Sequence, residues 1–419
     1  MDMLILQGLL GIGAFIAIAW LLSEDRRAIS WRIVLVGVAA QFIFAAMVTN
    51  LEFVRDGLRV LSDGVAAISA ATTEGSIMVF GYLGGGPPPF AVIEERSTFI
   101  LSLQAFPLIL VIGALSALLW HWRILIYLVR GAAIIMQRSF GVGGAVGVSS
   151  AANLFMGMSE APLLVRPYLP TLSRSELLVL MAGGMGTIAG SMMVLYGSIL
   201  EPHVPNAFGH LLAASVINIP AAIVLAKVMV PGEIAGGDQA NAIELKSEYS
   251  SSLDAITSGT IVSIKLLANV VALLLVFTAL ISLFNIMLGS LPDIQGAPLS
   301  LERIFGWLFA PIAWLIGIPW AESGTAGAIL GTKLAITEFI AYLNMLALPE
   351  DALSSRSTLI MTYALSSFAN LPSVAILIGG LNAMAPERHA EVVALGMRAL
   401  VAGACASAMS ACVIGILAT

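Results

Sequence analysis

The sequence predicts an all-α polytopic membrane protein with eight transmembrane helices, two of them discontinuous, two re-entrant helical hairpins and an interfacial amphipathic helix. Three observations predict this fold class. Of the 419 residues, 59% are hydrophobic and only 11% are charged, whereas a soluble domain carries about 25% charged residues. Apolar runs long enough to cross a bilayer, about 20 residues, recur along the chain. Several of these runs are interrupted by Gly, Pro or glutamate, which break a helix or place a costly charge at membrane depth.

Six apolar segments are long enough to cross the bilayer as intact helices. The first has no positively charged region before it and is directly followed by Glu24, so we expect it to remain in the protein rather than to be cleaved as a signal peptide. Residues 51–70 differ, because apolar side chains recur there at helical spacing with charged residues between them, which predicts an amphipathic helix in the membrane interface. The six segments are 3–22, 32–49, 98–120, 209–230, 263–289 and 391–417.

Two further segments, 174–199 and 356–383, are long enough to span but are interrupted. The first contains a glycine-rich run from Gly183 to Gly190, and the second contains Pro372. Glycine weakens a helix and proline removes a hydrogen-bond donor, so both segments are predicted to unwind within the membrane.

Two stretches, 139–172 and 300–346, are apolar but are each divided by a glutamate, Glu160 in the first and Glu322 in the second. Each half is too short to cross the bilayer, so we predict two re-entrant hairpins with these glutamates at their tips. The order hairpin, interrupted helix, intact helix then occurs twice, with the polar segment 231–258 between the halves. Corresponding interrupted helices in two halves mark the binding site of a secondary transporter.

Basic residues set the predicted orientation. With the N-terminus outside, most Lys and Arg residues fall at or near the cytoplasmic face, as the positive-inside rule requires. The first hairpin would then enter from the cytoplasm and the second from outside, so that their tips meet near the midplane. In a bacterial inner membrane both termini would be periplasmic.

Candidate cation ligands gather around the first hairpin and the first interrupted helix. Asn153 and Thr187 have side-chain oxygens, and unwound backbone at Met156 and Ile188 would free carbonyl oxygens. A hard cation such as Na⁺ prefers oxygen ligands and uses carbonyls at the ends of half-helices. These four residues are therefore candidates for a sodium site. The alternative is that Asn153 and Thr187 only make hydrogen bonds between packed helices.

The second hairpin and the second interrupted helix offer Glu322, Asn370 and Ser373. A carboxylate, an amide and a hydroxyl suit a ligand rich in hydroxyls, such as a sugar, and Trp320 and Phe368 would add apolar contact. A buried carboxylate without a partner is costly, which favours a ligand for Glu322. The alternative for Asn370 is that it only caps broken backbone.

Lys333 and Glu338 lie on the second limb of the second hairpin. They could pair with each other or reach the site, and we predict that they pair for structural reasons. If Lys333 instead paired with Glu322, that glutamate would be structural too.

Other classes of protein are disfavoured. Acidic residues exceed basic ones by 25 to 19, so no nucleic acid is expected as a partner. There is no metalloprotease or phosphate-loop motif, and Ser159 has no histidine or lysine base nearby, so we expect no enzyme and no organic cofactor. Cys405 and Cys412 are predicted to be small buried hydrophobic residues. A channel is a weaker alternative, because paired discontinuous helices are typical of alternating access.

Several short motifs, each weak alone, are specific as an ordered set. They are Asn153-Leu-Phe-Met-Gly157, Ser159-Glu160-Ala-Pro-Leu-Leu-Val-Arg-Pro167, Trp307-Leu-Phe-Ala-Pro311, Pro319-Trp320-Ala-Glu322, Lys333, Glu338-Phe-Ile-Ala-Tyr342 and Phe368-Ala-Asn370-Leu-Pro-Ser373. At these positions the sequence resembles the concentrative nucleoside transporter family. The resemblance covers most of the chain and is strongest over residues 139–417.

The resemblance implies a homotrimer in the lipid bilayer, in which a transport domain moves against a scaffold as an elevator, driven by Na⁺ or in some members by H⁺. It assigns 1–138 to the scaffold, 139–230 to the transport domain, 231–299 to a linker and a scaffold helix, and 300–419 to the transport domain.

The resemblance also assigns roles to single residues. Asn153, Met156, Thr187 and Ile188 match the sodium site. Met158, Ser159 and Glu160 match nucleobase contacts, Glu322, Asn370 and Ser373 match ribose contacts, and Phe368 lines the pocket. Met158 stands where the family usually has glutamine, and Ala321 where it has asparagine. Losing a hydrogen-bonding partner in a dry site costs about 1–3 kcal/mol, so selectivity for the base is expected to differ.

The hypothesis is therefore a symporter that imports nucleosides together with Na⁺. The alternatives are coupling to H⁺, transport of another ribose-like polar solute, and a membrane receptor of this fold that does not transport.

Overall fold

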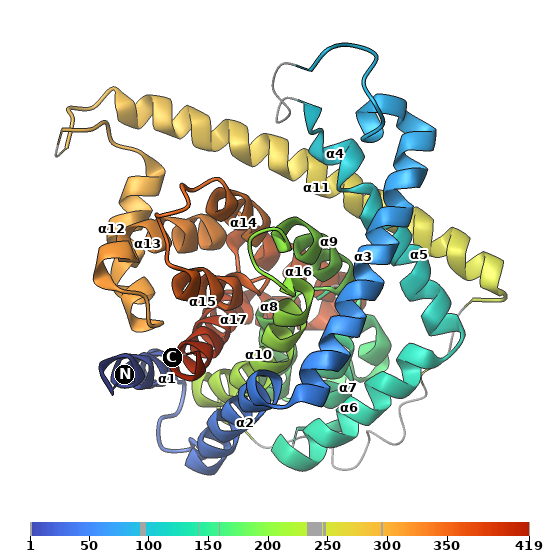
Figure 1. Ribbon diagram of the computed structural model, residues 1–419. Coiled ribbons are helices and arrows are strands. Elements are labelled where there is room, and N and C mark those ends of the chain that lie inside the picture. Colours follow the sequence, from blue (N-terminus) through green and yellow to red (C-terminus); the bar gives the residue numbers. More distant parts are fainter. Residues whose placement is uncertain are drawn as a thin grey trace.

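The computed structural model describes residues 2–92, 98–140, 142–158, 160–232, 245, 249–294 and 296–418. Within these ranges the chain is helical and contains no β-strand, as predicted (Figure 1). Four of the predicted intact spans form the centre of the molecule. They are α10 (Ala207–Met229) and α17 (His389–Leu417), which are largely buried and form the core of this group, and α1 (Asp2–Leu21) and α2 (Trp31–Asn50), which pack against them from the outside.

The amphipathic helix predicted over 51–70 is longer than expected. The structure has α3 at Glu52–Phe80, followed by the 3-10 turn η1 at Gly81–Gly84. Charged residues are concentrated before Asp63, and the remainder is largely apolar or small. The combined segment is long and apolar enough to cross a membrane, so the amphipathic pattern describes only its first part.

A second group of helices lies around this centre. The predicted span 98–120 consists of α4 (Leu101–Gln104) and α5 (Pro107–His121). The predicted span 263–289 is confirmed but begins earlier, as α11 (Ser252–Gly289), which crosses the outside of the molecule and packs chiefly on α5 (Figure 1). The amphipathic α6 (Ile124–Phe140) follows α5 and packs on the first hairpin.

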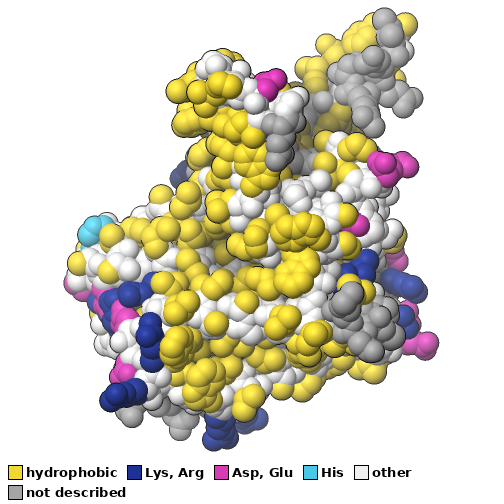
Figure 2. Space-filling view, turned by 90° about the vertical axis from the view of Figure 1, so that its left-hand side faces the viewer, with side chains coloured by type: hydrophobic (Ala, Val, Ile, Leu, Met, Phe, Trp, Pro, Cys, Tyr) yellow, Lys and Arg dark blue, Asp and Glu magenta, His cyan; other side chains and the backbone are white. Residues whose placement is uncertain are grey.

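The surface matches a membrane environment. Many large apolar side chains are exposed, including Leu275, Ile286 and Met287 on α11. Figure 2 shows hydrophobic side chains spread over one face, with charged side chains gathered toward its edges. A soluble monomer rarely exposes such wide apolar areas, so lipid or other protein is expected to cover them.

The first repeat has the predicted order of hairpin, broken helix and intact helix. The hairpin consists of α7 (Gly144–Ala152) and the 3-10 helix η3 (Ala161–Thr171). The broken helix consists of α8 (Arg174–Gly186) and α9 (Gly190–Leu200), and α10 follows. The glycines that predicted the break remain helical up to Gly186. They serve close packing instead, because a Cβ at Gly184 would lie only 2.9 Å from the Cβ of Met158.

The second repeat requires a correction. The stretch predicted as one hairpin, 300–346, contains three helices: α12 (Leu301–Leu315), α13 (Trp320–Ala335) and α14 (Glu338–Leu346). The broken helix that follows is α15 (Ser355–Leu365) and α16 (Leu371–Met384), and the turn η5 (Pro386–Arg388) leads into α17.

The tip of the second hairpin lies between α13 and α14, not at Glu322. Ser354, which follows α14, donates hydrogen bonds to Glu322 near the start of α13 at 3.1 and 3.2 Å. After α13 the chain therefore turns back, and by Ser354 it has returned to the start of α13. The turn at Ile336 and Thr337 is the tip, and Thr337 caps α14 by accepting a hydrogen bond from Ile340 N.

The two hairpins enter from opposite ends of α17, as predicted. Arg388, at one end, donates hydrogen bonds to the carbonyls of Leu169, Pro170 and Leu172 at the base of the first hairpin. At the other end, Arg356 bridges Gly415 O on α17 and Gly317 O before α13. With 29 residues, α17 is about 44 Å long, so the hairpin bases are separated by a membrane thickness.

Candidate ion and substrate site

The tip of the first hairpin rests against the break between α8 and α9. Gly190 N donates to Phe155 O at 3.3 Å, and a Cβ at Gly190 would lie 2.8 Å from that oxygen. Glycine is therefore required here for close approach of the two backbones. Asn153, Met156, Thr187 and Ile188, the residues predicted to bind sodium, lie on the two segments that this contact brings together.

Asn153 has the features of a cation ligand. Its side chain is 1% exposed at the end of α7, and among the described residues its Oδ1 has no hydrogen-bond partner. The Oγ of Ser150, one turn earlier on the same helix face, is likewise buried without a partner. Buried oxygens are normally paired, and an unpaired one costs free energy. A monovalent cation fits these two oxygens chemically.

The other predicted sodium residues are placed as expected but are partly engaged. Thr187 is 2% exposed, and its Oγ1 donates to Gly183 O at 2.9 Å, which leaves its lone pairs available. Residues 187–189 are not helical, so the Ile188 carbonyl is released from a helical ladder, and Met156 lies in the turn after α7. The alternative of hydrogen bonds between packed helices therefore describes neither the Thr187 hydroxyl, which donates within its own helix, nor Asn153 Oδ1.

Glu338 is the carboxylate at the second break. It is 4% exposed at the start of α14. Asn370 Nδ2 donates to its Oε2 at 2.8 Å, and the Tyr196 hydroxyl donates to its Oε1 at 2.7 Å. Asn370 also caps α16, because its Oδ1 accepts a hydrogen bond from Ser373 N at 2.8 Å. Asn370 therefore caps broken backbone, as the alternative predicts, but it does not only cap, because its amide nitrogen also donates to Glu338.

The structure does not bring Glu322 together with Asn370 and Ser373 as the sequence predicts, and the carboxylate beside Asn370 is Glu338. Glu322 accepts a hydrogen bond from Ser354, which caps the start of α15, whereas Asn370 lies beyond the end of α15. The eleven residues of α15 separate these points by about 16 Å. One small ligand cannot bridge both. Glu322 instead stabilises the amino end of α15, where a negative charge is favourable.

The residues predicted to contact a nucleobase lie at the first tip. Glu160 is partly buried and accepts a hydrogen bond from Gly157 N at 3.3 Å. Met158 is 7% exposed and packs against Gly184. Ser159 lies outside the described residues. Phe368 is partly exposed in the second break.

The two breaks are joined directly. Phe368 N donates to Thr187 O at 3.2 Å. Asn218, a fully buried amide on α10, donates to Gly186 O at 2.8 Å and to Ser366 O at 2.7 Å. One side chain therefore clamps both unwound segments, which places the sodium candidates next to the substrate candidates.

Sequence reasoning missed three residues of this region, Ser150, Tyr196 and Asn218, and it gave Glu338 a place at the site only as an alternative to structural pairing. Asn218 is an amide in the middle of an otherwise apolar span, which is a recognisable signal. Ser150 precedes Asn153 by three residues and so shares its helix face. No sequence pattern marks Tyr196, because its role depends on how the two repeats meet.

Lys333 does not form the predicted ion pair. Its ammonium donates to Ala364 O at 2.6 Å, Ser367 Oγ at 2.7 Å and Ser407 Oγ at 2.9 Å. It therefore binds the far end of α15 and α17 rather than the Glu338 carboxylate or Glu322.

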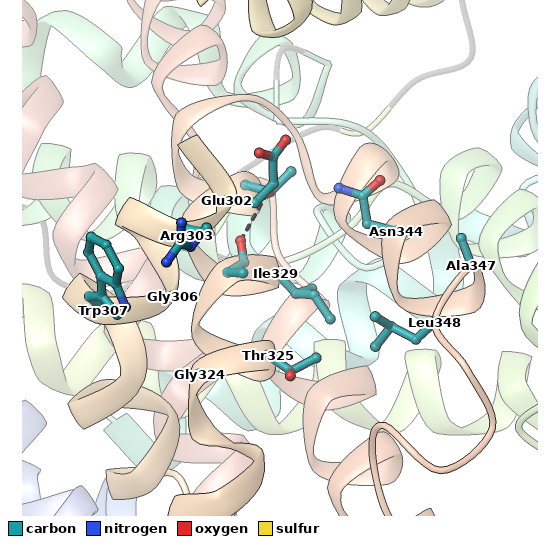
Figure 3. Close-up of a pocket in the computed structure, with 12 residues that line it drawn as sticks. Glu302, Arg303, Gly306, Trp307, Gly324, Thr325, Ile329, Asn344, Ala347 and Leu348 are labelled. Carbon is teal, nitrogen blue, oxygen red and sulfur yellow. Dashed lines mark hydrogen bonds between the residues drawn. The ribbon is translucent and has the colours of Figure 1, made fainter. Parts of the chain in front are cut away.

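A separate cavity of about 690 Å³ lies between α12, α13 and α14 (Figure 3). It is lined by Arg303, Trp307, Thr325 and Asn344, among others, and by none of the predicted site residues. The second hairpin thus packs on the second break with one face and borders open space with another.

Family models match nearly the whole chain. A model described as Na+ dependent nucleoside transporter C-terminus matches residues 210–415, and its N-terminus counterpart matches residues 10–83. A model described as Nucleoside recognition matches residues 102–203, which include the first tip and the first break.

Curated relatives are transporters. An uncharacterized transporter of Haemophilus influenzae is 36% identical over 99% of this chain and 98% of that protein. The nucleoside permease NupC of Helicobacter pylori is 32% identical over 98% of this chain and 97% of that protein. Sodium/nucleoside cotransporter 2 of Rattus norvegicus is also 32% identical; the match covers 97% of this chain but 62% of that longer protein.

Solved structures of a transporter also match the fold of this chain. CNTnw in an inward-facing substrate-bound state matches 99% of this chain and 97% of its own with a TM-score of 0.88 at 35% identity. A CNTnw variant in an outward-facing state matches all of this chain and 98% of its own with a TM-score of 0.89, also at 35% identity. The chain is therefore a membrane transporter and not an enzyme, and it belongs to the concentrative nucleoside transporter family.

Proposed function

We propose that this protein imports nucleosides across a bacterial inner membrane by symport with Na⁺. The observation that carries the proposal is the hydrogen bond between Thr187 O and Phe368 N. It joins a candidate sodium ligand to a candidate substrate residue, so that ordering one break orders the other. Coupling between the two ligands requires such a shared element.

The proposed sodium ligands are Asn153, Met156, Thr187 and Ile188, with Ser150 beside them. The ribose hydroxyls would bind Glu338, Asn370 and Ser373, because a carboxylate and an amide that already share a hydrogen bond form a fixed polar pair. The base would lie toward Glu160, Met158 and Phe368. Since Met158 offers no hydrogen bond to a base edge, we expect broad acceptance of different bases.

We propose an elevator movement of the central helices against α5 and α11, in a homotrimer with both termini periplasmic. The inward- and outward-facing states of CNTnw support two positions of the moving part. Contrary to the division expected from the sequence, α1 and α2 would travel with the moving part, because they pack on α10 and α17.

The test is uptake of radiolabelled uridine and adenosine into proteoliposomes that contain the purified protein. An inward Na⁺ gradient should drive accumulation, and replacement of NaCl by choline chloride should abolish it. Accumulation driven by a pH gradient without Na⁺ would replace the sodium proposal with proton coupling. Absence of both uptake and counterflow, with nucleoside binding retained, would indicate a receptor.

A further inference from the structure

Lys333 carries a buried positive charge at the second break that the transport proposal does not use. The side chain is 4% exposed near the end of α13. Its three hydrogen bonds, to Ala364 O, Ser367 Oγ and Ser407 Oγ, occupy all the donors of an ammonium group. Ser367 Oγ in turn lies 3.0 Å from Ser407 Oγ. The ammonium is therefore enclosed by oxygens, as a bound metal cation would be.

The groups around Lys333 favour a positive charge. Ala364 lies in the last turn of α15, where unpaired carbonyls give the helix end a partial negative charge. This end is buried, so water cannot screen it. Ser367 lies within the break, directly before Phe368. The charge of Lys333 therefore holds the backbone that leads to the substrate residues.

The two repeats place Lys333 and Asn153 in corresponding positions. Asn153 directly follows the first limb of the first hairpin, and a Cβ at Gly183, near the end of α8, would lie 3.9 Å from its Nδ2. Lys333 lies in the last turn of the first limb of the second hairpin and binds near the end of α15. Each residue thus joins a hairpin tip to the end of the half-helix that follows.

We propose that the Lys333 ammonium is a tethered cation that fills, in the second repeat, the place that Na⁺ takes in the first. This inference rests on the proposed sodium site at Asn153. Lys333 acts as a positioning residue for Ser367 and Phe368, and it limits the protein to a single exchangeable sodium. A lysine that only stabilised the fold would have no influence on the number of sodium ions bound.

The test counts bound ²²Na⁺ per chain at saturation in the full-length protein in detergent. Removing the side chain in Lys333→Ala leaves three oxygens that suit a hard cation, so bound sodium should rise about two-fold. Adding Ser407→Ala in that background removes one of these oxygens and should weaken the additional sodium about ten-fold. Lys227→Ala is the matched control, because Lys227 is also buried but donates to Gly232 O at the end of α10.

Each outcome supports or overturns one of the two proposals. An unchanged sodium count in folded Lys333→Ala would overturn the tethered cation, and so would a variant that stays unfolded even in saturating NaCl, because sodium should replace the ammonium. A wild-type chain that binds no sodium would overturn the proposed function instead. Lys333→Ala would then still test the inference, by gaining sodium where the wild type has none.

Discussion

Both carboxylate oxygens of Glu338 accept hydrogen bonds from other helices, Tyr196 on α9 and Asn370 at the second break. These donors fix the carboxylate in one orientation. An ionised carboxylate has about four lone-pair sites, so hydroxyls of a ligand can bind beside them. Glu338 therefore links the two broken helices through a group that also faces the proposed substrate.

Replacing Glu338 should impair substrate binding, whereas the same change at Glu322 should not. Glu338→Gln loses a charge-assisted hydrogen bond worth about 1.5–3 kcal/mol, so the KM for uridine uptake should rise about 10- to 100-fold. Glu322→Gln serves as the matched control, because Glu322 accepts its hydrogen bonds from Ser354 at the start of α15, far from Asn370. Equal effects of the two substitutions on KM would place the ribose elsewhere.

Filling the space beside Asn153 should remove sodium dependence. Asn153→Leu replaces the unpaired Oδ1 with methyl groups of similar volume, so the fold should be retained while bound ²²Na⁺ falls below detection. Asn344→Leu is the control, since Asn344 lines the cavity beside the second hairpin. Sodium binding that survives in Asn153→Leu would contradict the assignment.

The sodium candidates could be predicted from sequence because they lie within a few residues of visible helix breaks. The choice between Glu322 and Glu338 could not, because both carboxylates stand in similar apolar surroundings. Glu322 lies near the start of α13 and Glu338 lies just after its end. Tertiary packing decides which of these two ends meets the second break. Lys333 shows the same limit, since its partners come from α15 and α17, 31 and 74 residues later in the chain.

At the scale of elements, both broken helices were predictable and the second tip was not. Pro372 lies in the first turn of α16, where proline is tolerated, and so marks the break correctly. Gly317, with φ of +104°, and Pro319 mark the turn between α12 and α13, and Glu322, where the sequence predicts the tip, follows this turn. The tip between α13 and α14 has neither glycine nor proline; Ile336 caps the end of α13, and Thr337 caps the start of α14.

Asn218 should transmit sodium binding to the substrate site. Asn218→Leu removes both hydrogen bonds of the clamp, so sodium should no longer raise nucleoside affinity. Coupling between sites is typically about 5- to 150-fold in affinity. The measurement compares the Kd for uridine with and without Na⁺. Ser215→Ala is the control, because Ser215 lies one turn away on α10 and is equally buried; an intact sodium effect in Asn218→Leu would exclude the clamp.

At the scale of the whole molecule, α1 and α2 are bound to the centre at several points. A Cβ at Gly37 on α2 would lie 3.5 Å from the Cβ of Val224 on α10. Glu24, in the connection between α1 and α2, pairs with Arg174 and Arg398, each at 2.8 Å. By contrast, α5 packs on the rest of the molecule through apolar contacts, among them Leu108 and Ile112 with Val194 on α9, and Phe106, at its start, with Phe339 on α14.

Disulfide cross-links should distinguish the moving helices from the static ones. In a background with Cys405 and Cys412 replaced by alanine, oxidising Ile112→Cys/Val194→Cys should stop uptake, because it ties α5 to α9. Oxidising Gly37→Cys/Val224→Cys should leave uptake unchanged, since a Cβ separation of 3.5 Å suits a disulfide within one rigid part. Uptake blocked by the second pair alone would assign α2 to the scaffold.

The positive charge of Lys333 would also make the movement of the transport domain sensitive to voltage. A charge that crosses the membrane field changes energy by about 2.3 kcal/mol per 100 mV. The Lys333 ammonium would cross outward and return in every cycle, so it would add nothing to the net current. Each reorientation would still depend on voltage through this charge, and a steady current would report sodium alone, while brief voltage-jump transients would report the lysine.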